Sequence, residues 1–354
     1  MDNPDQARPN LFGLEREALA EALEPLGARR FHADQAYRWM YARGVRDPSA
    51  WTDHAVPLRG AIAATFRIDP GTASPHRTAD DGTVKYRNRT ADGLDVESVY
   101  MIAEDDRTTL CVSSQVGCAL DCDFCLTGKM GFRRNLSTGE IVGQVDAIRD
   151  DQDLGGRPFN IVFMGMGEPL HNYDAVTAAI RILTDPDGFG LSRRRITVST
   201  VGLVPAIERL AAEPVRPRLA VSLNATTDAV RDRLMPVNRK WNLARLLAAC
   251  ETWLATTRDR FTFEYVLLDG INDSDADVER LARIALRARA KLNLIPFNAV
   301  PGYLSYRPPT DDRVDRIRQR LAGRGVPTTV RWSRGRDARA ACGQLALLPE
   351  GAPS

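Results

Sequence analysis

Cysteine and histidine are scarce in this chain, with six and four residues among 354. No apolar run approaches the ~20 residues that a membrane-spanning helix requires. The first residues, MDNPDQARPNLFGLERE, are polar and lack the apolar stretch of a secretory signal. We therefore expect a cytoplasmic protein without a membrane segment. Cytoplasmic cysteines rarely form structural disulfides, so the few present here need another explanation.

Composition and total charge also exclude the extreme classes of protein. Hydrophobic residues make up 44% and charged residues 27%, and the formal net charge is +2. These values are typical of a globular protein and give no sign of a strongly basic nucleic-acid binder. The length fits one large domain with an appendage.

The first part of the chain has helical periodicity. Apolar residues recur at helical spacing in LEREALAEALEPLG (14–27) and ADQAYRWMYARGV (33–45). The polar segment ASPHRTAD (73–80) predicts turns and a boundary, and the alternation around ADG predicts a strand pair over 83–102. We accordingly divide the chain into an N-terminal helical domain (1–76), a β-hairpin linker (77–106) and a larger domain (107–354).

In the larger domain, short β-rich runs alternate with helical segments. The predicted strands cover residues 108–114, 159–165, 194–200, 218–224, 261–267, 291–298 and 327–333. Helical patterns lie between them, for example at 137–150, where Ser137 or Thr138 is a suitable N-cap. Six such βα units predict a parallel sheet, either doubly wound or curled into a full or partial barrel. In a barrel the chemistry lies at the carboxyl ends of the strands, where polar, glycine-containing loops follow here.

Three of the cysteines fall within CALDCDFC, at residues 118–125. Cys118, Cys122 and Cys125 have the spacing C-x3-C-x2-C, which lets three thiolates converge on one soft metal centre. A tetrahedral zinc site needs a fourth ligand, and neither the remaining cysteines nor the four histidines form a second pair. Three thiolates fit a [4Fe–4S] cluster with one open iron. A zinc site completed by a distant residue remains the alternative.

This motif resembles the signature of the radical S-adenosylmethionine enzymes. CALDCDFC follows the first predicted parallel strand, and GMGEP follows the second, as in that superfamily. The resemblance implies that the open iron binds the amino and carboxylate groups of S-adenosylmethionine. Reductive cleavage of that cofactor then yields a 5′-deoxyadenosyl radical.

Longer segments resemble one family in particular. TTLCVSSQVGCALDCDFCLTGKMGFRRNL, RDARAACGQLA and FHADQAYRWMYARGV are similar to the RlmN family of dual-specificity 23S rRNA and tRNA adenine-C2 methyltransferases. The likeness spans roughly residues 30–346. It implies an α/β fold, a partial (βα)6 TIM-like radical SAM barrel with an N-terminal helical accessory domain that docks RNA. It also implies that each turnover consumes two molecules of S-adenosylmethionine.

The chemistry of the reaction requires more than a radical. Carbon 2 of adenine is electrophilic, so a methyl group must first move to a protein thiolate, and a radical formed on that methyl group then adds to the ring. The resemblance assigns the methyl-carrying thiol to Cys342 and the resolving thiol of a transient disulfide to Cys111. It assigns the proton acceptor to Glu97, although Glu104 is a second carboxylate in the same stretch. Cys250 lies in a leucine- and alanine-rich helical pattern and is interpreted as core packing.

The loops after the predicted strands supply candidate contacts for S-adenosylmethionine. A carboxylate can accept hydrogen bonds from the ammonium of the cofactor, and short polar groups suit a ribose or an adenine edge. The positions that match the family are Gly167, Glu168, Ser199, Ser222, Leu223, Asn224 and Asn298. Alone, such residues at strand ends are usually turn or cap residues.

Local basic clusters point to the RNA partner. Nine arginines and four aspartates lie between 311 and 340, and further arginines stand at 133–134 and 193–195. Collected around one mouth, they would neutralise phosphates. The N-terminal helices offer a second docking candidate, with Arg29, Arg30, Arg38, Arg43 and Arg46 around the aromatic residues Tyr37, Trp39 and Tyr41, which could equally be core. The target base must leave its stack to react.

Two other functions remain open from the sequence. The related methyltransferases that act at carbon 8 of the same rRNA adenosine, and so confer antibiotic resistance, share this machinery. A zinc-stabilised RNA-binding protein without activity is the alternative from another class. For an enzyme we expect a monomer supplied with electrons by a low-potential donor such as flavodoxin or ferredoxin.

Overall fold

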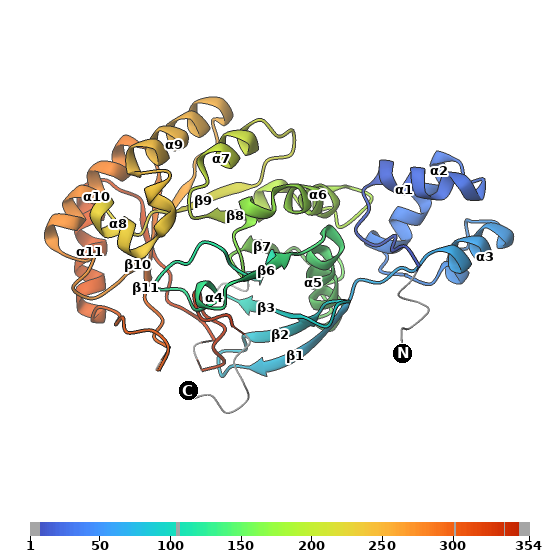
Figure 1. Cartoon of the computed structure of the whole chain (residues 1–354), viewed down its shortest axis with the longest axis horizontal. Coiled ribbons are helices and arrows are strands. Elements are labelled where there is room, and N and C mark those ends of the chain that lie inside the picture. The colour runs from blue at the N-terminus through green and yellow to red at the C-terminus, as the bar shows by residue number, and fades with distance from the viewer. Residues whose placement is uncertain (1–7, 104–106, 301, 336, 347–354) are drawn as a thin grey trace.

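One open, strongly curved sheet organises most of the chain (Figure 1). The structure is a computed structural model and describes residues 8–103, 107–300, 302–335 and 337–346. Within these residues the sheet has ten strands in the order β1-β2-β3-β4-β7-β8-β9-β10-β11-β12. Their bounds are β1 Thr72–Thr78, β2 Val84–Arg89, β3 Asp95–Ile102, β4 Thr108–Cys111, β7 Asn160–Phe163, β8 Ile196–Thr200, β9 Arg218–Ser222, β10 Thr262–Leu267, β11 Lys291–Pro296 and β12 Thr328–Val330.

The sheet combines an antiparallel flap with a parallel partial barrel. Strands β1, β2, β3 and β4 pair antiparallel, and β4 and β7 to β12 pair parallel in sequence order. The order is linear, with β1 and β12 at its two edges, so the barrel is open. A separate pair, β5 (Gln115–Gly117) and β6 (Phe132–Asn135), flanks the segment that holds the three clustered cysteines.

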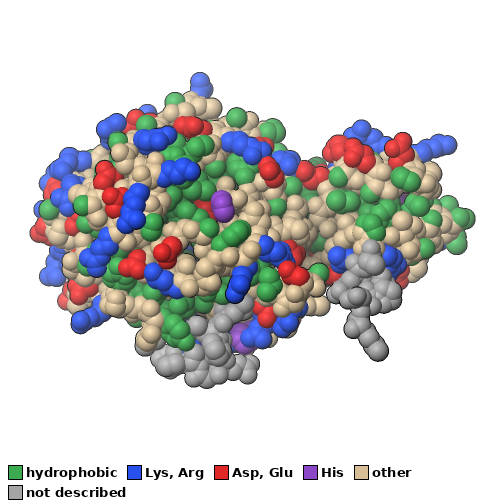
Figure 2. All heavy atoms as spheres, viewed as in Figure 1, with side chains coloured by type: hydrophobic (Ala, Val, Ile, Leu, Met, Phe, Trp, Pro, Cys, Tyr) green, Lys and Arg blue, Asp and Glu red, His purple; other side chains and the backbone are tan. Residues whose placement is uncertain are grey.

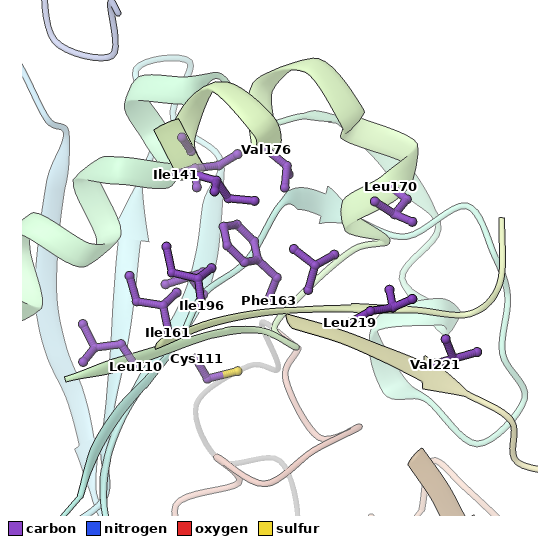
Figure 3. Packing of buried hydrophobic residues seen from close by; sticks show 14 of the residues in the cluster. Leu110, Cys111, Ile141, Ile161, Phe163, Leu170, Val176, Ile196, Leu219 and Val221 are labelled. Carbon is purple, nitrogen blue, oxygen red and sulfur yellow. The ribbon is translucent and has the colours of Figure 1, made fainter. Parts of the chain in front are cut away.

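Helices cover the outer face of the parallel strands (Figure 1). They are α5 Thr138–Asp151, α6 Tyr173–Thr184, α7 Val204–Ala211, α8 Asp228–Leu234, α9 Leu243–Thr257, α10 Asp275–Arg287 and α11 Asp311–Gly323. Alternate strand residues such as Leu110, Ile161 and Phe163 point toward these helices and form the buried core (Figure 3). The residues between them face the inside of the barrel, because successive side chains of a strand lie on opposite faces.

Local sequence signals explain where the helices begin. Ser137 accepts a hydrogen bond from the amide of Glu140, whose carboxylate accepts one from the amide of Ser137. This capping box satisfies two amides that the first turn of α5 would otherwise leave without a partner. It confirms Ser137 as the N-cap.

The N-terminal helices form a smaller body against α5 and α6 (Figure 1). Helices α1 (Arg16–Leu23), α2 (Arg30–Tyr37) and α3 (Val56–Thr65) and a π-helical turn at Arg38–Ala42 surround fully buried aromatic side chains. Arg16 pairs with Asp185 at 2.6 Å, and Arg149 of α5 donates to the carbonyl of Tyr41. Tyr37 and Tyr41 are core residues, whereas Trp39 is half-buried beneath the guanidinium of Arg43.

The sequence analysis is confirmed for the fold class and corrected at one segment. The strand pair expected over 83–102 is β2 and β3, and the seventh strand expected near 327–333 is β12. The turns expected over 73–80 are wrong, because β1 occupies most of this segment and pairs with β2. A polar strand at a sheet edge lacks the apolar alternation that marks a buried strand. The three-part division of the chain stays a prediction.

The helices were compared with the length and hydropathy of membrane-spanning segments. No helix within the described part of the chain combines the length and the apolar character that crossing a bilayer demands.

Helix α5 approaches the chain before β1 so closely that it tolerates only glycine at one position. A Cβ atom on Gly143 would lie 1.9 Å from the carbonyl oxygen of Pro70. We expect Gly143→Ala to lower the free energy of unfolding by about 1–3 kcal/mol, because the backbone must move. The measurement is urea-induced unfolding followed by circular dichroism.

The matched control is Gly60→Ala in α3, where a Cβ atom would meet nothing within 4 Å. This change should raise the free energy of unfolding by about 0.5–1 kcal/mol, since alanine favours a helix interior. An unfolding midpoint of Gly143→Ala equal to that of the wild type would contradict the proposed contact.

Candidate active site

The inside of the partial barrel is a cavity of about 1360 Å³. Its wall consists of the strand residues that alternate with the core-facing ones. On successive strands these are Cys111, Val162, Thr197, Ala220, Glu264 and Asn293. The C-terminal tail contributes Ala340, Ala341, Cys342 and Leu345. The space is large enough for a nucleoside-sized group, as ligand pockets occupy roughly 300–1,000 Å³.

Two free cysteines face this cavity from distant parts of the chain. Cys111 ends β4 with 5% of its surface exposed, and Cys342 belongs to the tail. Figure 3 shows the sulfur of Cys111 on the face of the strands opposite Leu110 and Ile161. Burial, and then the neighbouring Cys342, raise the pKa of the Cys111 thiol to about 12. The structure thus brings together the two cysteines that the sequence analysis pairs.

A half-buried cation lies beside both thiols. The Arg331 guanidinium interacts electrostatically with Cys342, Glu264 and Cys111, and Cys342 contributes most to its raised pKa. Its Nη1 donates to the sulfur of Met164 at 3.2 Å, and its amide donates to the carbonyl of Leu294. Arg331 opposes the rise in the pKa of Cys111. The charge of Arg331 therefore stabilises the thiolate form of Cys111.

Glu97 forms a buried ion pair close to the tail. Its carboxylate lies 2.9 Å from Nζ of Lys85, and the two side chains are 2% and 4% exposed. Lys85 also donates to the carbonyl of Arg339 at 3.4 Å. Burial raises the pKa of Glu97, although Lys85, a hydrogen bond from the amide of Ala346 in the tail, and Arg87 oppose the rise. Among the described residues none donates a hydrogen bond to its Oε2, so this oxygen can accept a proton. Glu104, the other carboxylate considered, lies outside the described residues.

The three clustered cysteines lie on one loop between β5 and the short helix α4 (Leu126–Lys129). Gly117 starts the loop with a φ of 75°, where a Cβ atom would lie 1.8 Å from the carbonyl oxygen of Gly131. The amide of Cys118 donates to that same carbonyl, and the amide of Cys125 donates to Cys122. These contacts fold the loop so that all three thiols are mutually close.

The donor set fits an iron–sulfur cluster. Burial raises the pKa of each clustered thiol, and Cys118 and Cys125 raise that of Cys122 further. Three neighbouring thiols, buried at Cys122 and half-buried at Cys118 and Cys125, lose their protons when a metal centre offsets the negative charge. Within the described ranges no three His, Cys, Asp or Glu side chains are gathered closely enough for a single metal ion. A four-iron cube separates its thiolate ligands more widely, because each binds a different iron.

Hydrogen bonds hold the tail against the end of the cysteine loop. The amide of Leu126 donates to the carbonyl of Gly343 at 2.9 Å, and Oγ1 of Thr127 donates to that of Leu345 at 2.5 Å. Nδ2 of Asn298 donates to the carbonyl of Cys342 at 3.0 Å. Cys342 consequently lies near enough to Cys125 to raise its pKa.

The loop after β7 contains a closely packed glycine and a buried carboxylate. Gly167 has a φ of 98°, and a Cβ atom there would lie 2.5 Å from Cβ of Gln115. Glu168 accepts hydrogen bonds from the amides of Leu170 at 3.0 Å and Val201 at 2.9 Å. Burial raises the pKa of Glu168 to about 7. The side chain of Thr200 also forms a hydrogen bond with this carboxylate and opposes the rise in its pKa. The cofactor role of Glu168 stays a prediction.

The other predicted cofactor residues divide into two groups. Ser199 and Ser222 are half-buried and follow Thr197 and Ala220 on the inner faces of β8 and β9. Asn298 leaves its buried Oδ1 without a hydrogen-bond partner while its amide holds the tail. These three residues present polar atoms at the carboxyl ends of the strands.

Leu223 and Asn224 are engaged within the protein instead. Leu223 is fully buried, and its amide donates to the carbonyl of Glu264. Oδ1 of Asn224 accepts from the amide of Val266 at 2.8 Å. Cys250 is fully buried in α9, which confirms its interpretation as core.

Three cations inside the fold escaped the sequence analysis: the buried Lys85 and Arg231 and the half-buried Arg331. Arg231 is fully buried and donates to the carbonyls of Leu223 and Val201. Burial lowers its pKa to about 10, and Cys122 opposes this change. A charged residue inside a strand, as in TVKYR and TTVRW, was the available signal for Lys85 and Arg331. No sequence signal distinguished Arg231 from a surface residue.

The predicted RNA-binding arginines do not gather around one mouth. Arg134 pairs with Asp92 and Glu140 beside β6, whereas Arg193 and Arg194 line the cavity at the amino ends of the strands. Most arginines of α11 pair with acidic residues of α10 and α11, as the alternation of blue and red side chains there illustrates (Figure 2). That expectation is therefore wrong for the set as a whole.

Comparison with known proteins identifies the family of the chain. The Radical SAM superfamily matches residues 112–282, and the Ribosomal RNA large subunit methyltransferase N-terminal domain matches residues 9–68. The dual-specificity RNA methyltransferase RlmN of Anaeromyxobacter dehalogenans is 47% identical over 359 residues, covering 100% of this chain and 95% of its own. That of Geobacter sulfurreducens is 48% identical, covering 97% and 95%.

A solved structure has the same fold along nearly its whole length. The radical SAM methyltransferase from Sphaerobacter thermophilus superposes with a TM-score of 0.89 at 46% identity, covering 95% of this chain and 99% of its own. With the cysteine loop, the paired thiols and both family matches in agreement, the chain belongs to the RlmN family of dual-specificity RNA methyltransferases within the radical SAM superfamily.

Proposed function

We propose that this protein methylates carbon 2 of an adenosine in the peptidyl-transferase region of 23S rRNA and of the adenosine 3′ of the anticodon in tRNAs. The observation that carries the proposal is the meeting of Cys111 and Cys342 in one cavity, beside a loop of three thiols. Methylation through a thiol needs both of these features together. Family membership supplies the substrate class.

The iron–sulfur cluster of the cysteine loop and S-adenosylmethionine would together supply the radical. Cys118, Cys122 and Cys125 would hold the [4Fe–4S] cluster. The residues that would surround S-adenosylmethionine are Gly167, Glu168, Ser199, Ser222, Leu223, Asn224 and Asn298. When bound, the two together supply a methyl group and an oxidising carbon radical. Thr127 and Leu126 keep the tail at the edge of this loop, and the tail excludes water from it.

Cys342 carries the methyl group. As a thiolate it would displace the methyl group from the sulfonium of bound S-adenosylmethionine, and the electron pair of the broken bond would leave on the sulfur of the cofactor. The Arg331 guanidinium lies beside this thiol, and Cys342 is its strongest electrostatic neighbour. A hydrogen atom of the methyl group would then pass to the radical that the cofactor supplies, and the carbon radical left on Cys342 would add to carbon 2 of the adenine.

Glu97 and Cys111 release the product. The adduct would pass one electron to the oxidised cluster held by the three clustered cysteines, and Glu97 would then take the proton from carbon 2 on Oε2 of its carboxylate. Cys111 then attacks the sulfur of Cys342, so that the disulfide forms as the bond from sulfur to the methylene carbon breaks. That carbon takes the electron pair and a proton and becomes the methyl group. Such a disulfide is transient, as expected in a reducing compartment.

The finer assignments follow from the same family membership. We place the enzyme in the cytoplasm as a monomer, reduced by a low-potential donor such as flavodoxin or ferredoxin. The carbon-8 reaction is the second candidate, since the same thiols would serve it. The relatives bear the RlmN name, which favours carbon 2.

Nucleoside analysis tests the reaction and the position of the methyl group together. Anaerobic incubation of RNA with reconstituted enzyme, reductant and S-adenosylmethionine should yield 2-methyladenosine on digestion and mass spectrometry. Cys342→Ala should abolish it because the methyl carrier is lost, and Cys250→Ala should preserve it. Finding 8-methyladenosine, or no methyladenosine with the wild type, would overturn the assignment.

Iron content tests the cysteine loop. Replacing Cys122 by serine should lower bound iron and sulfide in anaerobically purified protein to near zero, since two thiolates do not retain the cluster. The matched control, Cys250→Ser, removes an equally buried thiol from α9 and should keep the iron. Equal iron in both variants would refute the loop as the ligand set.

The pH dependence of product release tests Glu97. Lys85 lowers the pKa of Glu97, so removing the cation in Lys85→Met should raise that pKa further. A base works when deprotonated, so the rising limb of single-turnover rate against pH should move to higher pH, by about 1–3 units for loss of a close opposite charge. Lys85→Arg keeps the charge and should restore the limb. A limb at the wild-type pH in Lys85→Met would exclude Glu97 as the base.

A further inference from the structure

One buried carboxyl group faces the reaction cavity and takes no part in the steps above. Glu264 lies on the inner face of β10 with 6% of its surface exposed, and it lines the cavity together with Cys111 and Cys342. Asp259, the other acidic residue among the described ones that line this cavity, pairs with Arg193 at 2.8 Å. Burying an acid costs free energy unless a partner or a ligand replaces the lost water. A contact with a ligand in the cavity would account for this cost at Glu264.

A row of side chains across three strands fixes this carboxyl group. Glu264, Asn293 and Thr329 stand at the same register on β10, β11 and β12. Nδ2 of Asn293 donates to Oε2 of Glu264 at 2.7 Å, and Oδ1 of Asn293 accepts from Oγ1 of Thr329 at 3.1 Å. Because Oε2 is fixed as an acceptor, a proton on this carboxyl group occupies Oε1. The two oxygens therefore have a set order of acceptor and donor.

The nearby cation Arg331 does not occupy the carboxyl group. Its guanidinium opposes the rise in the pKa of Glu264 that burial causes, but the net change is still a rise, which favours the protonated acid. The guanidinium donates to the sulfur of Met164 at 3.2 Å. In the described part of the chain, Asn293 is the one group that donates a hydrogen bond to the carboxyl group of Glu264. Oε1 is thus left for a ligand.

The position of Glu264 separates it from the predicted cofactor contacts. The structure describes all seven residues predicted to contact S-adenosylmethionine, and none of these seven lines the cavity. The cavity instead contains the two thiols, and Arg331 interacts electrostatically with both thiols and with Glu264. Glu264 therefore faces the space in which the methyl group on Cys342 meets the base.

The Watson–Crick edge of adenine matches the order of the two oxygens. This edge carries the N–H bonds of the 6-amino group beside the acceptor N1. Oε2 of Glu264 can accept from the amino group with its second lone pair, and a protonated Oε1 can donate to N1. Guanine and hypoxanthine have the reverse order, with a carbonyl O6 beside N1–H. Enzymes that act on an unstacked base read it by hydrogen bonds to this edge.

We propose that Glu264 selects adenine as the reacting base by pairing its carboxyl group with the 6-amino group and N1. This inference rests on the proposed function, which places the base in the cavity. The contact lies at the edge of the ring and leaves both faces of the base free for attack by a carbon radical. Since N1 adjoins carbon 2, a proton donated to N1 also withdraws electron density from the carbon that reacts.

Binding of RNAs that differ by a single group tests the proposal. The probes are fluorescent stem-loop RNAs that carry adenosine, purine riboside or inosine at the target position. Purine riboside lacks the 6-amino group, and inosine has O6 and N1–H instead. The reconstituted holoenzyme is kept without reductant so that no radical forms, and dissociation constants are measured by fluorescence anisotropy.

The wild type should bind the adenosine probe roughly 10-fold to 100-fold more tightly than the other two, because a buried acid would otherwise lose its hydrogen bonds. Glu264→Gln should keep this preference, since an amide offers the same acceptor and donor. Glu264→Leu should bind all the probes with equal affinity. The matched control, Glu208→Leu, removes an exposed carboxylate from α7 and should keep the wild-type ratios.

Three results would each refute the selection of adenine by Glu264. They are equal affinity of the wild type for the adenosine and purine riboside probes, loss of the preference in Glu264→Gln, and an unchanged preference in Glu264→Leu. Methylation of Cys342 by S-adenosylmethionine without RNA should proceed in both variants, which shows an intact site. The titration needs no turnover, so absence of 2-methyladenosine with the wild type would count against the proposed function alone.

Discussion

The docking of the C-terminal tail on the cysteine loop is the contact on which the site depends. Residues 340–346 have no helix or strand of their own, and three hydrogen bonds fix Cys342 and its neighbours. Leu126 and Thr127 follow directly after Cys125, so the stretch that ends the metal-binding loop also positions the carrier thiol. Each such bond contributes only about 1 kcal/mol. The two thiols are thus held differently. Cys111 is fixed in a strand, whereas Cys342 lies in an irregular segment that is released when a few hydrogen bonds break.

Buried charges around the cavity serve the chemistry and not the stability of the fold. Taking the ion pair of Lys85 and Glu97 out of water has a large desolvation penalty, and apolar side chains of similar size would often be more stable. The opposed pKa changes, raised for Glu97 and lowered for Lys85, record that penalty. A base that must accept a proton at neutral pH benefits from the same shift. Burial of the ion pair thus lowers the stability of the fold and at the same time raises the pKa of Glu97 to suit a base.

The sequence predicts the alternation of strands and helices well and the interior of the barrel poorly. The parallel strands, the Ser137 cap and the Cys250 core position follow from periodicity and local hydrogen-bonding chemistry. Lys85, Arg231 and the half-buried Arg331 were missed because the enclosure of a charged residue depends on partners far away in the chain. Strand β1 was missed because an edge strand needs no apolar pattern. The roles of Cys111 and Cys342 came from resemblance, since each alone is a small buried residue or a turn residue.

The open sheet lets one cavity serve two reactants of very different size. A closed eight-stranded barrel fills its interior with side chains, whereas this sheet ends at β1 and β12 and leaves space inside. Radical chemistry requires exclusion of water at one end, and the tail and α4 provide it through contacts within the chain.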